Sequence, residues 1–339
     1  MPLPSHHLKV SSRARGGLAD MMHALRAQPL LQRGRFFSTT FPEIKKVGVV
    51  GLGLMGHGIA QTAAEKGFEV VAIESESRFL DSGMARIEAS VKKLGEKAVK
   101  KGKMSAEDAE AAATATLGRI SPSLDRAVFA ECDVIVEAVI EDLALKKPLY
   151  EDIGRVVKDT CIIASNTSSL AIHKMGAFSG RPAQMVGLHF FNPVQLMQLV
   201  EVVRTDQTDP ALFQGAMGFA KALGKTPVEC IDTEGFVVNR LLVPYLIEAM
   251  ALVDRGVASA PDVDVAMKLG AGHPMGPIQL ADYIGLDTIH NIISGWVADF
   301  PDNPSFQVPA SLKAKVDAGQ LGRKTGQGYY KWEGDKLAA

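Results

Sequence analysis

The sequence predicts an α/β fold: a Rossmann-type, doubly wound, mostly parallel sheet with a helical hairpin arm, followed by an all-α C-terminal domain. Short runs of branched apolar residues alternate with helical segments between residues 45 and 231, which is the pattern of βαβ units. A glycine-rich turn follows the first of these runs, and almost wholly helical sequence follows residue 235. A chain of 339 residues is also long enough for two domains.

Seven segments are short, apolar and rich in branched side chains, as buried strands are. They cover residues 47–50, 69–73, 134–136, 161–164, 185–188, 199–203 and 227–231. Residues 78–116 are instead charged and rich in Ala, Lys and Glu, with a break near Lys101-Gly102-Lys103. This pattern predicts two helices that form a hairpin arm.

Helical patterns cover residues 59–66, before the second predicted strand, and residues 237–255, 262–269 and 280–297 near the end of the chain. We therefore place a domain boundary near residues 232–235. The expected organisation is a leader over residues 1–42, a nucleotide-binding domain over 43–234 and a helical substrate and dimerisation domain over 235–339.

The first 42 residues differ from the rest in composition. Serine is frequent, and Asp20 is the one acidic residue among six basic side chains: Lys9, Arg13, Arg15, Arg26, Arg33 and Arg35. An Arg-rich, Ser-rich, acid-poor segment predicts a mitochondrial transit peptide and hence the matrix. A disordered extension or a mis-assigned start is the alternative. A secretory signal is disfavoured because no apolar core follows the charges.

The composition of the chain argues against several partners. The formal net charge is -1, so no strong field would attract nucleic acid or a membrane surface. No apolar run approaches the roughly 18 residues of a membrane span. Cys132, Cys161 and Cys230 are isolated, which predicts neither a disulfide framework nor a metal site and fits a reducing compartment.

Residues 51–56 read Gly51-Leu52-Gly53-Leu54-Met55-Gly56, a G-x-G-x-x-G element between a predicted strand and a predicted helix. The first glycine permits the tight turn, the second lets backbone amides approach a pyrophosphate, and the third lets the helix pack closely. Glu74 ends the second strand, where a carboxylate binds ribose hydroxyls and repels a 2′-phosphate. NAD is therefore the expected cofactor, and a glycine-rich turn without a ligand is the alternative.

Three polar residues fall at or beyond later strands. Ser168 follows one strand, His189 ends the next, and Glu201 lies twelve residues further on. Histidine suits a general base because its pKa lies near neutrality, and a carboxylate beside it fixes the tautomer. These are the residue types that the oxidation of an alcohol requires. A structural histidine at a strand end is the alternative that spacing alone leaves open.

At this point the sequence resembles the short-chain L-3-hydroxyacyl-CoA dehydrogenases, the NAD enzymes of fatty acid β-oxidation, including 3-hydroxybutyryl-CoA dehydrogenases. The resemblance covers residues 45–332 and rests on several motifs in the family's order. They are GLGLMG, SNTSSL, GLHFFNPV, LVEVV, DTEGFVVNRLL, KLGAGHPMGP and GRKTGQGYY.

The resemblance implies roles for particular residues. His189 matches the catalytic histidine, Glu201 its partner acid, Ser168 a serine near substrate and nicotinamide, and Asn239 an asparagine that holds the substrate. The positions that match further contacts with NAD are Glu141, Lys146, Asn192 and Lys324, and those near coenzyme A are Ser90 and Lys97.

Three features keep a plainer alternative. Lys97 belongs to a cluster of lysines, and such a cluster usually forms a solvent-exposed face of a helix. The apolar stretch Phe236–Val253 suits the family's homodimer contact, but it equally suits the domain's own core. His57, inside the glycine-rich turn, receives no role.

The expected reaction is the reversible NAD-dependent oxidation of (S)-3-hydroxyacyl-CoA to 3-oxoacyl-CoA, without a metal, on short to medium acyl chains. A β-hydroxyacid dehydrogenase of the hydroxyisobutyrate kind is one alternative, which the HFFNP and VNR motifs disfavour. A non-catalytic, crystallin-like relative is another, which the intact set of polar residues disfavours.

Overall fold

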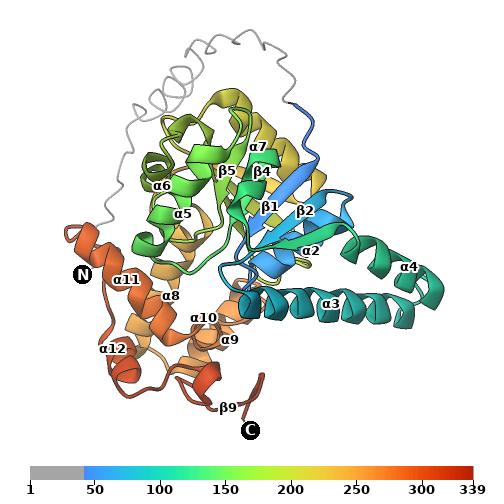
Figure 1. Ribbon diagram of the computed structural model, residues 1–339. Coiled ribbons are helices and arrows are strands. Elements are labelled where there is room, and N and C mark those ends of the chain that lie inside the picture. Colours follow the sequence, from blue (N-terminus) through green and yellow to red (C-terminus); the bar gives the residue numbers. More distant parts are fainter. Residues whose placement is uncertain (1–41, 339) are drawn as a thin grey trace, which may run out of the picture. The chain divides into compact units, whose positions relative to one another are not determined.

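The computed structural model describes residues 42–338. An eight-stranded sheet has the order β3-β2-β1-β4-β5-β6-β7-β8 (Figure 1). All neighbouring strands run parallel except β6 and β7, which are antiparallel. The mostly parallel sheet expected from the sequence is therefore confirmed. The strands are β1 (Lys46–Val50), β2 (Glu69–Ile73), β3 (Ile120–Ser123), β4 (Val134–Glu137), β5 (Ile162–Ser165), β6 (Met185–Phe190), β7 (Leu199–Arg204) and β8 (Thr226–Ile231).

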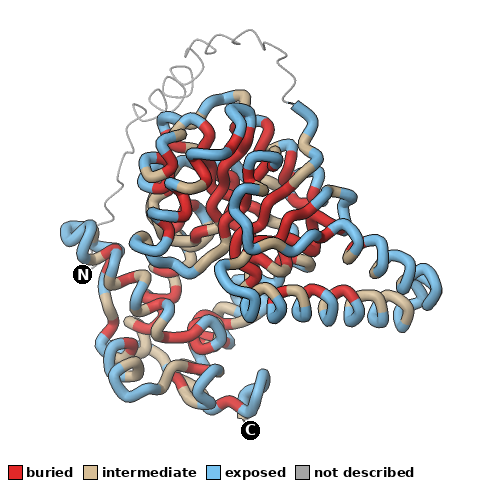
Figure 2. Tube along the Cα trace, in the orientation of Figure 1, coloured by how far each residue is buried: buried red, intermediate tan, exposed pale blue. Residues whose placement is uncertain are grey.

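Helices cover both faces of this sheet, as a doubly wound fold requires. Residues of α2 and α7 pack with Val47 and Val49 in one apolar core, and residues of α5 and α6 pack with Ile135 and Ile163 in another. Successive strand residues point to opposite faces. In the six inner strands both faces are buried and the residues read as nearly continuous apolar runs (Figure 2), whereas the edge strands β3 and β8 are mostly exposed. The helices are α2 (Gly56–Glu65), α5 (Leu143–Val156), α6 (Ile172–Ser179) and α7 (Pro210–Ala222), with short turns η1 (Arg126–Glu131) and η2 (Pro182–Gln184).

The predicted hairpin arm is present as α3 (Ser77–Lys100) and α4 (Ala106–Leu117). The two helices are separated after Lys100, at the Lys101-Gly102-Lys103 break that the sequence indicated. Ser105 caps α4 by accepting a hydrogen bond from the Asp108 N–H at 3.0 Å, which satisfies one of the free donors of the first turn. The arm lies between β2 and β3 in the chain, and α3 packs against α2 (Figure 1).

The C-terminal region has its own apolar core, built from helices around Leu246, Met250 and Ile293. Gly285, with a φ of 112°, separates two helices where the sequence predicted one over residues 280–297. A short antiparallel strand pair also lies in this otherwise helical region. The elements are α8 (Val238–Asp254), α9 (Ala260–Gly270), α10 (Pro277–Ile284), α11 (Leu286–Asp299), α12 (Ala310–Asp317), η3 (Arg323–Thr325), β9 (Trp332–Glu333) and β10 (Lys336–Leu337).

Strand β3 was not predicted from the sequence. Its four residues include Pro122 and two serines, so neither apolar alternation nor β-propensity indicates a strand. Within residues 42–338 it pairs with β2 alone, and Pro122 is tolerated because an edge strand has one side without a ladder.

Two helical glycines give a matched test of this packing. A Cβ on Gly154 in α5 would lie 1.7 Å from the Ser179 carbonyl oxygen, whereas a Cβ on Gly218 in α7 would meet nothing within 4 Å. We expect Gly154→Ala to lower the free energy of unfolding by about 3 kcal/mol or more, because backbone must move. Gly218→Ala should raise it by about 0.5–1 kcal/mol through helix propensity. Urea unfolding measures the free energy of unfolding of both variants. Equal effects would contradict the close contact between Gly154 and the Ser179 backbone.

Candidate active site

The three glycines of the turn after β1 meet three different requirements. Gly51 has a φ of 87°, which favours glycine, and its N–H donates to the Ile73 carbonyl at 2.8 Å. A Cβ on Gly56 would lie 1.7 Å from the Gly51 oxygen, so α2 packs directly on the turn. A Cβ on Gly53 would meet nothing within 4 Å. The space beside Gly53 lies at the N-terminus of α2, where backbone N–H groups favour an anion.

Glu74 follows β2 and closes the same turn from the other side. Its Oε1 accepts from the Leu52 N–H at 2.6 Å, and its Oε2 from the Ser75 N–H at 3.3 Å. A cavity of about 440 Å³ adjoins this carboxylate. Apolar walls with one carboxylate suit a nucleoside, so these residues fit the adenosine half of NAD. The lining residues are Val50, Gly53, Ile73, Glu74, Ser75, Phe79, Arg126, Ala138, Val139, Ile140, Leu145 and Leu149.

Two further side chains of this turn differ in exposure and contacts. The Leu54 side chain is largely exposed. The His57 Nδ1 lies 2.7 Å from the Gly53 carbonyl oxygen, and a carbonyl only accepts, so Nδ1 carries the hydrogen. His57, to which sequence reasoning gave no role, therefore holds the turn at Gly53.

His189 on β6 and Glu201 on β7 face each other across the antiparallel strand pair. They are direct register partners, and the His189 Nδ1 lies 2.6 Å from the Glu201 Oε2. Glu201 is fully buried and His189 is 6% exposed. The imidazole ring packs against Phe191 and Phe236, with centroids 4.5 and 5.8 Å away. The structure thus brings the predicted pair together in an almost fully buried position.

The second oxygen of Glu201 accepts from the first turn of α8. The N–H groups of Val237 and Val238 donate to Oε1 at 3.0 and 2.8 Å, and Asn239 is the next residue. Burial raises the pKa of Glu201, but the hydrogen bonds from His189 and from these two amides outweigh burial, so this pKa lies below its ordinary value. Glu201 is accordingly an anion that only accepts hydrogen bonds.

The loop that carries Ser168 is tied to the end of β6. The Asn166 Oδ1 accepts from the Phe190 N–H at 2.9 Å, next to His189. The Ser168 N–H donates to the Glu141 Oε1 at 2.9 Å. Asn166 was missed as a functional residue, although it stands in the SNTSSL motif, because nothing in its spacing shows that it reaches another strand.

The four additional positions implied for NAD lie in different settings. Glu141, in the loop before α5, and Asn192, directly after β6, are both exposed. Lys146 is 1% exposed, and its ammonium bonds Glu137 at 2.6 Å and Glu141 at 3.4 Å.

Lys324 lies in the helical region, where its ammonium pairs with Asp287 at 2.5 Å. Within residues 42–338, no hydrogen bond or ion pair joins Lys324 to the glycine-rich turn.

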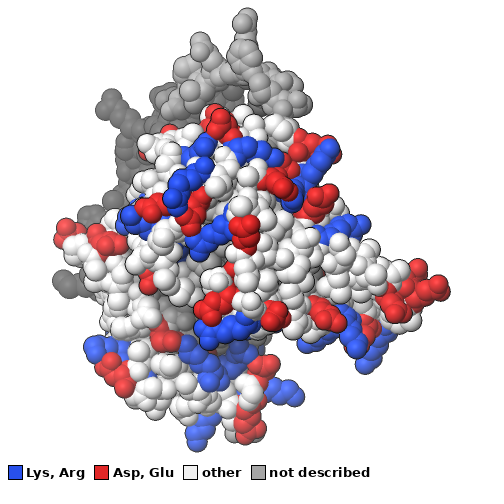
Figure 3. All heavy atoms as spheres, viewed as in Figure 1, with Lys and Arg blue, Asp and Glu red and all other residues white. Residues whose placement is uncertain are grey.

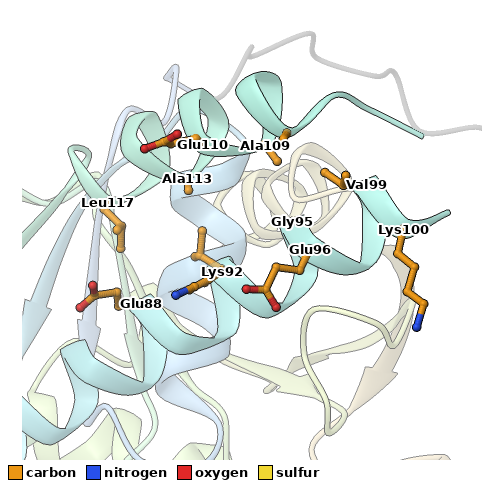
Figure 4. A pocket seen from close by; sticks show the side chains of 12 residues that line it. Glu88, Lys92, Gly95, Glu96, Val99, Lys100, Ala109, Glu110, Ala113 and Leu117 are labelled. Atoms are coloured by element: carbon orange, nitrogen blue, oxygen red, sulfur yellow. The ribbon is translucent and has the colours of Figure 1, made fainter. Parts of the chain in front are cut away.

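The two positions implied for coenzyme A lie on α3. The Ser90 Oγ accepts from the Gln195 Nε2 at 3.2 Å, and Lys97, two turns later on the same side of the helix, is exposed. A groove of about 630 Å³ lies between α3 and α4, and neither Ser90 nor Lys97 lines it (Figure 4). Its lining residues are Glu88, Val91, Lys92, Gly95, Glu96, Val99, Lys100, Ala106, Ala109, Glu110, Ala113 and Leu117.

Three further properties of the described residues concern surface charge, metal ligands and membrane spans. Basic and acidic side chains are interspersed on the face shown in Figure 3, so that face carries no broad field of one sign. Among residues 42–338, no group of three or more His, Cys, Asp or Glu is arranged to hold a metal. None of the helices in this range is long and apolar enough to cross a membrane.

Two family models match the chain. The 3-hydroxyacyl-CoA dehydrogenase NAD binding domain matches residues 46–233, and the 3-hydroxyacyl-CoA dehydrogenase C-terminal domain matches residues 235–332. The chain belongs to the 3-hydroxyacyl-CoA dehydrogenase family. It is thus an NAD-dependent oxidoreductase of fatty acid β-oxidation, as the sequence predicted, and not a dehydrogenase of the hydroxyisobutyrate kind.

Individual relatives agree with this membership. The mitochondrial hydroxyacyl-coenzyme A dehydrogenase of Rattus norvegicus is 46% identical over 291 residues, which are 86% of this chain and 92% of the relative. A probable 3-hydroxybutyryl-CoA dehydrogenase of Deinococcus radiodurans is 47% identical over 290 residues, 85% of this chain and 100% of the relative. The crystal structure of (S)-3-hydroxybutyryl-CoA dehydrogenase from Ralstonia eutropha superposes with a TM-score of 0.80 at 38% identity, over 86% of this chain and 100% of that one.

The lowered pKa of Glu201 has a consequence for stability. A carboxyl whose folded pKa is depressed stabilises the fold fully above its ordinary pKa of 4.5, and this contribution is lost as pH falls through the lower folded value. We expect Glu201→Gln to cost about 2 kcal/mol of unfolding free energy at neutral pH, with the difference from wild type shrinking below pH 4.5.

Urea unfolding at several pH values measures this difference. Glu229→Gln is the control, because Glu229 is an exposed carboxylate paired with Arg204 at the surface, and exposed pairs contribute little. A Glu201→Gln deficit that persists undiminished in acid would contradict the assigned anion.

Proposed function

We propose that the chain oxidises (S)-3-hydroxyacyl-CoA thioesters of short to medium acyl length to 3-oxoacyl-CoA, reversibly, with His189 as the general base. The observation that carries this proposal is the 2.6 Å contact between the His189 Nδ1 and the buried Glu201 carboxylate. NAD supplies the hydride acceptor when it is bound. The residues of the chain take up the hydroxyl proton and orient the substrate.

The tautomer of His189 follows from its partner. Since the Glu201 carboxylate only accepts, Nδ1 must carry the hydrogen, and the lone pair is then on Nε2. No residue within 42–338 hydrogen-bonds that Nε2. It can therefore take the proton from the C3 hydroxyl as the hydride leaves C3, and the anionic Glu201 stabilises the imidazolium that forms.

Two polar side chains are proposed to hold substrate oxygens beside His189. Asn239 stands one residue after the amide of Val238 that Glu201 binds. Ser168 is in the loop that Asn166 fastens to the end of β6. Both are half-buried, so a ligand can reach them.

Glu74 is proposed to select NAD over NADP, because a carboxylate repels a 2′-phosphate. Nearby Arg78 could attract that phosphate, but its guanidinium pairs with Glu76 at 2.9 Å. Arg126, which lines the same cavity, is likewise paired, with Asp152, so neither guanidinium is an unpaired cation beside Glu74, which supports the choice of NAD. The proposed contacts with the cofactor are residues 51–56, Glu74, Glu141, Ser168, Asn192 and Lys324.

Ser90 and Lys97 are proposed to contact the coenzyme A moiety. Their position seven residues apart on α3 puts both on one side of the helix. The ammonium of Lys97 suits the phosphates of the substrate. Truncating Lys97 should weaken acyl-CoA binding more at low salt than at high salt.

We also propose a homodimer through the helical region, which begins near residue 235. Part of the stretch Phe236–Val253 is that region's own core, since Leu246 and Met250 are fully buried. Other apolar side chains on its helices are exposed and support a contact: Leu241, Val265, Leu269 and Ile284. Light scattering of the purified chain measures its mass.

The mitochondrial matrix is the proposed compartment. The basic, serine-rich composition of residues 1–42 supports it, although this predicted leader lies almost wholly outside the described residues. The relative from Rattus norvegicus is a mitochondrial protein by name. Cell fractionation with and without residues 1–42 tests the proposal.

The base is tested by His189→Gln. We expect kcat to fall by about 10²–10⁴-fold with little change in KM, because the proton acceptor is lost while the shape is kept. The assay follows the loss of NADH absorbance with acetoacetyl-CoA, and a series of chain lengths defines specificity.

The matched control is His173→Gln. His173 also pairs with a carboxylate, Asp232 at 2.7 Å, but it is exposed. Unimpaired turnover of His189→Gln, or an equal loss in His173→Gln, would rule out the proposed base. Absence of turnover of acetoacetyl-CoA by the wild type would contradict the proposed substrate range.

The cofactor choice is tested by Glu74→Gln, which removes the charge while an amide oxygen can still accept from Leu52. We expect the ratio of NADPH to NADH affinity to rise about tenfold, because the repulsion of the 2′-phosphate disappears. Nucleotide fluorescence titration measures both affinities. Glu69→Gln, at the exposed opposite end of β2, is the control and should leave the ratio unchanged.

A further inference from the structure

The loop between β6 and β7 is fastened to the elements beside it. Val194 is 2% exposed, and a Cβ on Gly58 in α2 would lie 2.9 Å from the Val194 Cβ, so the loop packs directly on α2. The buried Lys225 ammonium, just before β8, donates to the carbonyls of Val194 and Met197, to the second at 2.9 Å. The backbone around Gln195 is therefore held from two sides.

A chain of hydrogen bonds runs from α2 through the Gln195 side chain to α3. The Gln61 Nε2 donates to the Glu65 carboxylate at 2.8 Å, and the Gln61 Oε1 accepts from the Gln195 Nε2 at 2.8 Å. The same Gln195 Nε2 donates to the Ser90 Oγ at 3.2 Å. Gln61 is fully buried, so both ends of its amide need partners, and this chain supplies them.

The Glu65 carboxylate at one end of the chain sets the direction of every hydrogen bond in it. An ionised carboxylate only accepts, so the Gln61 amide turns its NH2 group toward Glu65 and its oxygen toward Gln195. Gln195 must then present its own NH2 group to that oxygen, and the second hydrogen of this group points to Ser90. The Ser90 Oγ is thus an acceptor toward Gln195, which leaves its own hydrogen for another partner.

The hydrogen of the Ser90 hydroxyl is available to a ligand. Within residues 42–338 this hydroxyl donates no hydrogen bond, and Ser90 is half-buried. We propose that Gln195 is a positioning residue that orients the Ser90 hydroxyl as a donor to an acceptor oxygen of coenzyme A beyond its cysteamine end. The proposal rests on the contact with coenzyme A given to Ser90 under the proposed function, and it assigns the direction of that contact.

The position of α3 explains why the acceptor belongs to this part of coenzyme A. Lys97, whose ammonium suits phosphates, lies about 10 Å further along the same side of the helix. The phosphates of coenzyme A are beyond its cysteamine end, so a single side of α3 faces that portion of the substrate.

The test compares two substrates that differ only in the coenzyme A moiety. Acetoacetyl-CoA contains the whole moiety, whereas S-acetoacetyl-N-acetylcysteamine lacks everything beyond the cysteamine, including the phosphates. Both substrates use the same NADH site and the same proposed acid–base residue, so a disturbance of Asn192 or His189 changes the kinetics of both. A loss confined to acetoacetyl-CoA identifies an effect on coenzyme A binding.

We expect Gln195→Met to raise the KM for acetoacetyl-CoA about threefold and Ser90→Ala to raise it about tenfold, because each weakens a hydrogen bond to the substrate. The kcat should stay unchanged in both variants, because the bond is the same in the ground state and the transition state. With the truncated thioester, both variants should keep the wild-type kcat/KM. The double variant should match Ser90→Ala alone, because Gln195 acts through Ser90.

Gln198→Met is the matched control. Gln198 belongs to the same loop but is exposed, and its side chain, unlike that of Gln195, makes no hydrogen bond within residues 42–338. Its substitution should leave the KM for both substrates at wild-type values.

Defined outcomes would overturn the proposal. An unchanged KM in Gln195→Met beside a raised KM in Ser90→Ala shows that Gln195 does not position Ser90. An equal loss with both substrates means that Gln195 only supports the fold of the loop, and additive effects in the double variant mean that it acts independently of Ser90. If Gln195→Met fails to fold, Gln195→Ala gives the same readout, because it adds no volume beside Gly58.

Ser90→Ala separates this proposal from the proposed function. An unchanged KM for acetoacetyl-CoA in Ser90→Ala shows that the contact assigned to Ser90 is wrong, and the positioning proposal is then wrong with it. A raised KM in Ser90→Ala supports the contact, and the Gln195 variants then decide the positioning proposal alone.

Discussion

The proposed site depends on the hydrogen bonds that the buried Glu201 carboxylate accepts. One of its oxygens meets the imidazole of His189, and the other accepts the first amides of α8. A single anion thereby joins the proposed base on the sheet to the helix that carries Asn239. Its burial is compensated by three donors, one of them an imidazole and two at the positive end of a helix.

The antiparallel pairing of β6 and β7 makes this contact possible. In a parallel sheet, a residue twelve positions after His189 would not return to face it without a crossover connection. Here the chain turns back after Phe190, and the register sets Glu201 directly opposite His189. The one departure from parallel order in the eight-stranded sheet therefore coincides with the acid–base pair.

The two buried carboxylates Glu201, on β7, and Glu137, on β4, have different partners. Glu201 faces His189, whereas Glu137 is enclosed by donors, among them the Lys146 ammonium and the Tyr150 hydroxyl. The glycine-rich turn completes the arrangement, because Gly53 leaves open space at the start of α2 and Glu74 borders an apolar cavity. Polar groups thus meet at the carboxyl ends of the parallel strands, where ligands of such sheets bind.

The sequence by itself determined the sheet class, the glycine-rich turn, the arm and the helical C-terminal region, because periodicity and glycine placement are local properties. It did not reveal β3, whose Pro122 and serines show no strand pattern, or the division of one predicted helix at Gly285. Only the tertiary structure decided that His189 meets Glu201, that Asn166 reaches Phe190 and that Lys146 is enclosed by two carboxylates. Those contacts depend on strand register and burial, which arise from pairing between segments distant in the chain.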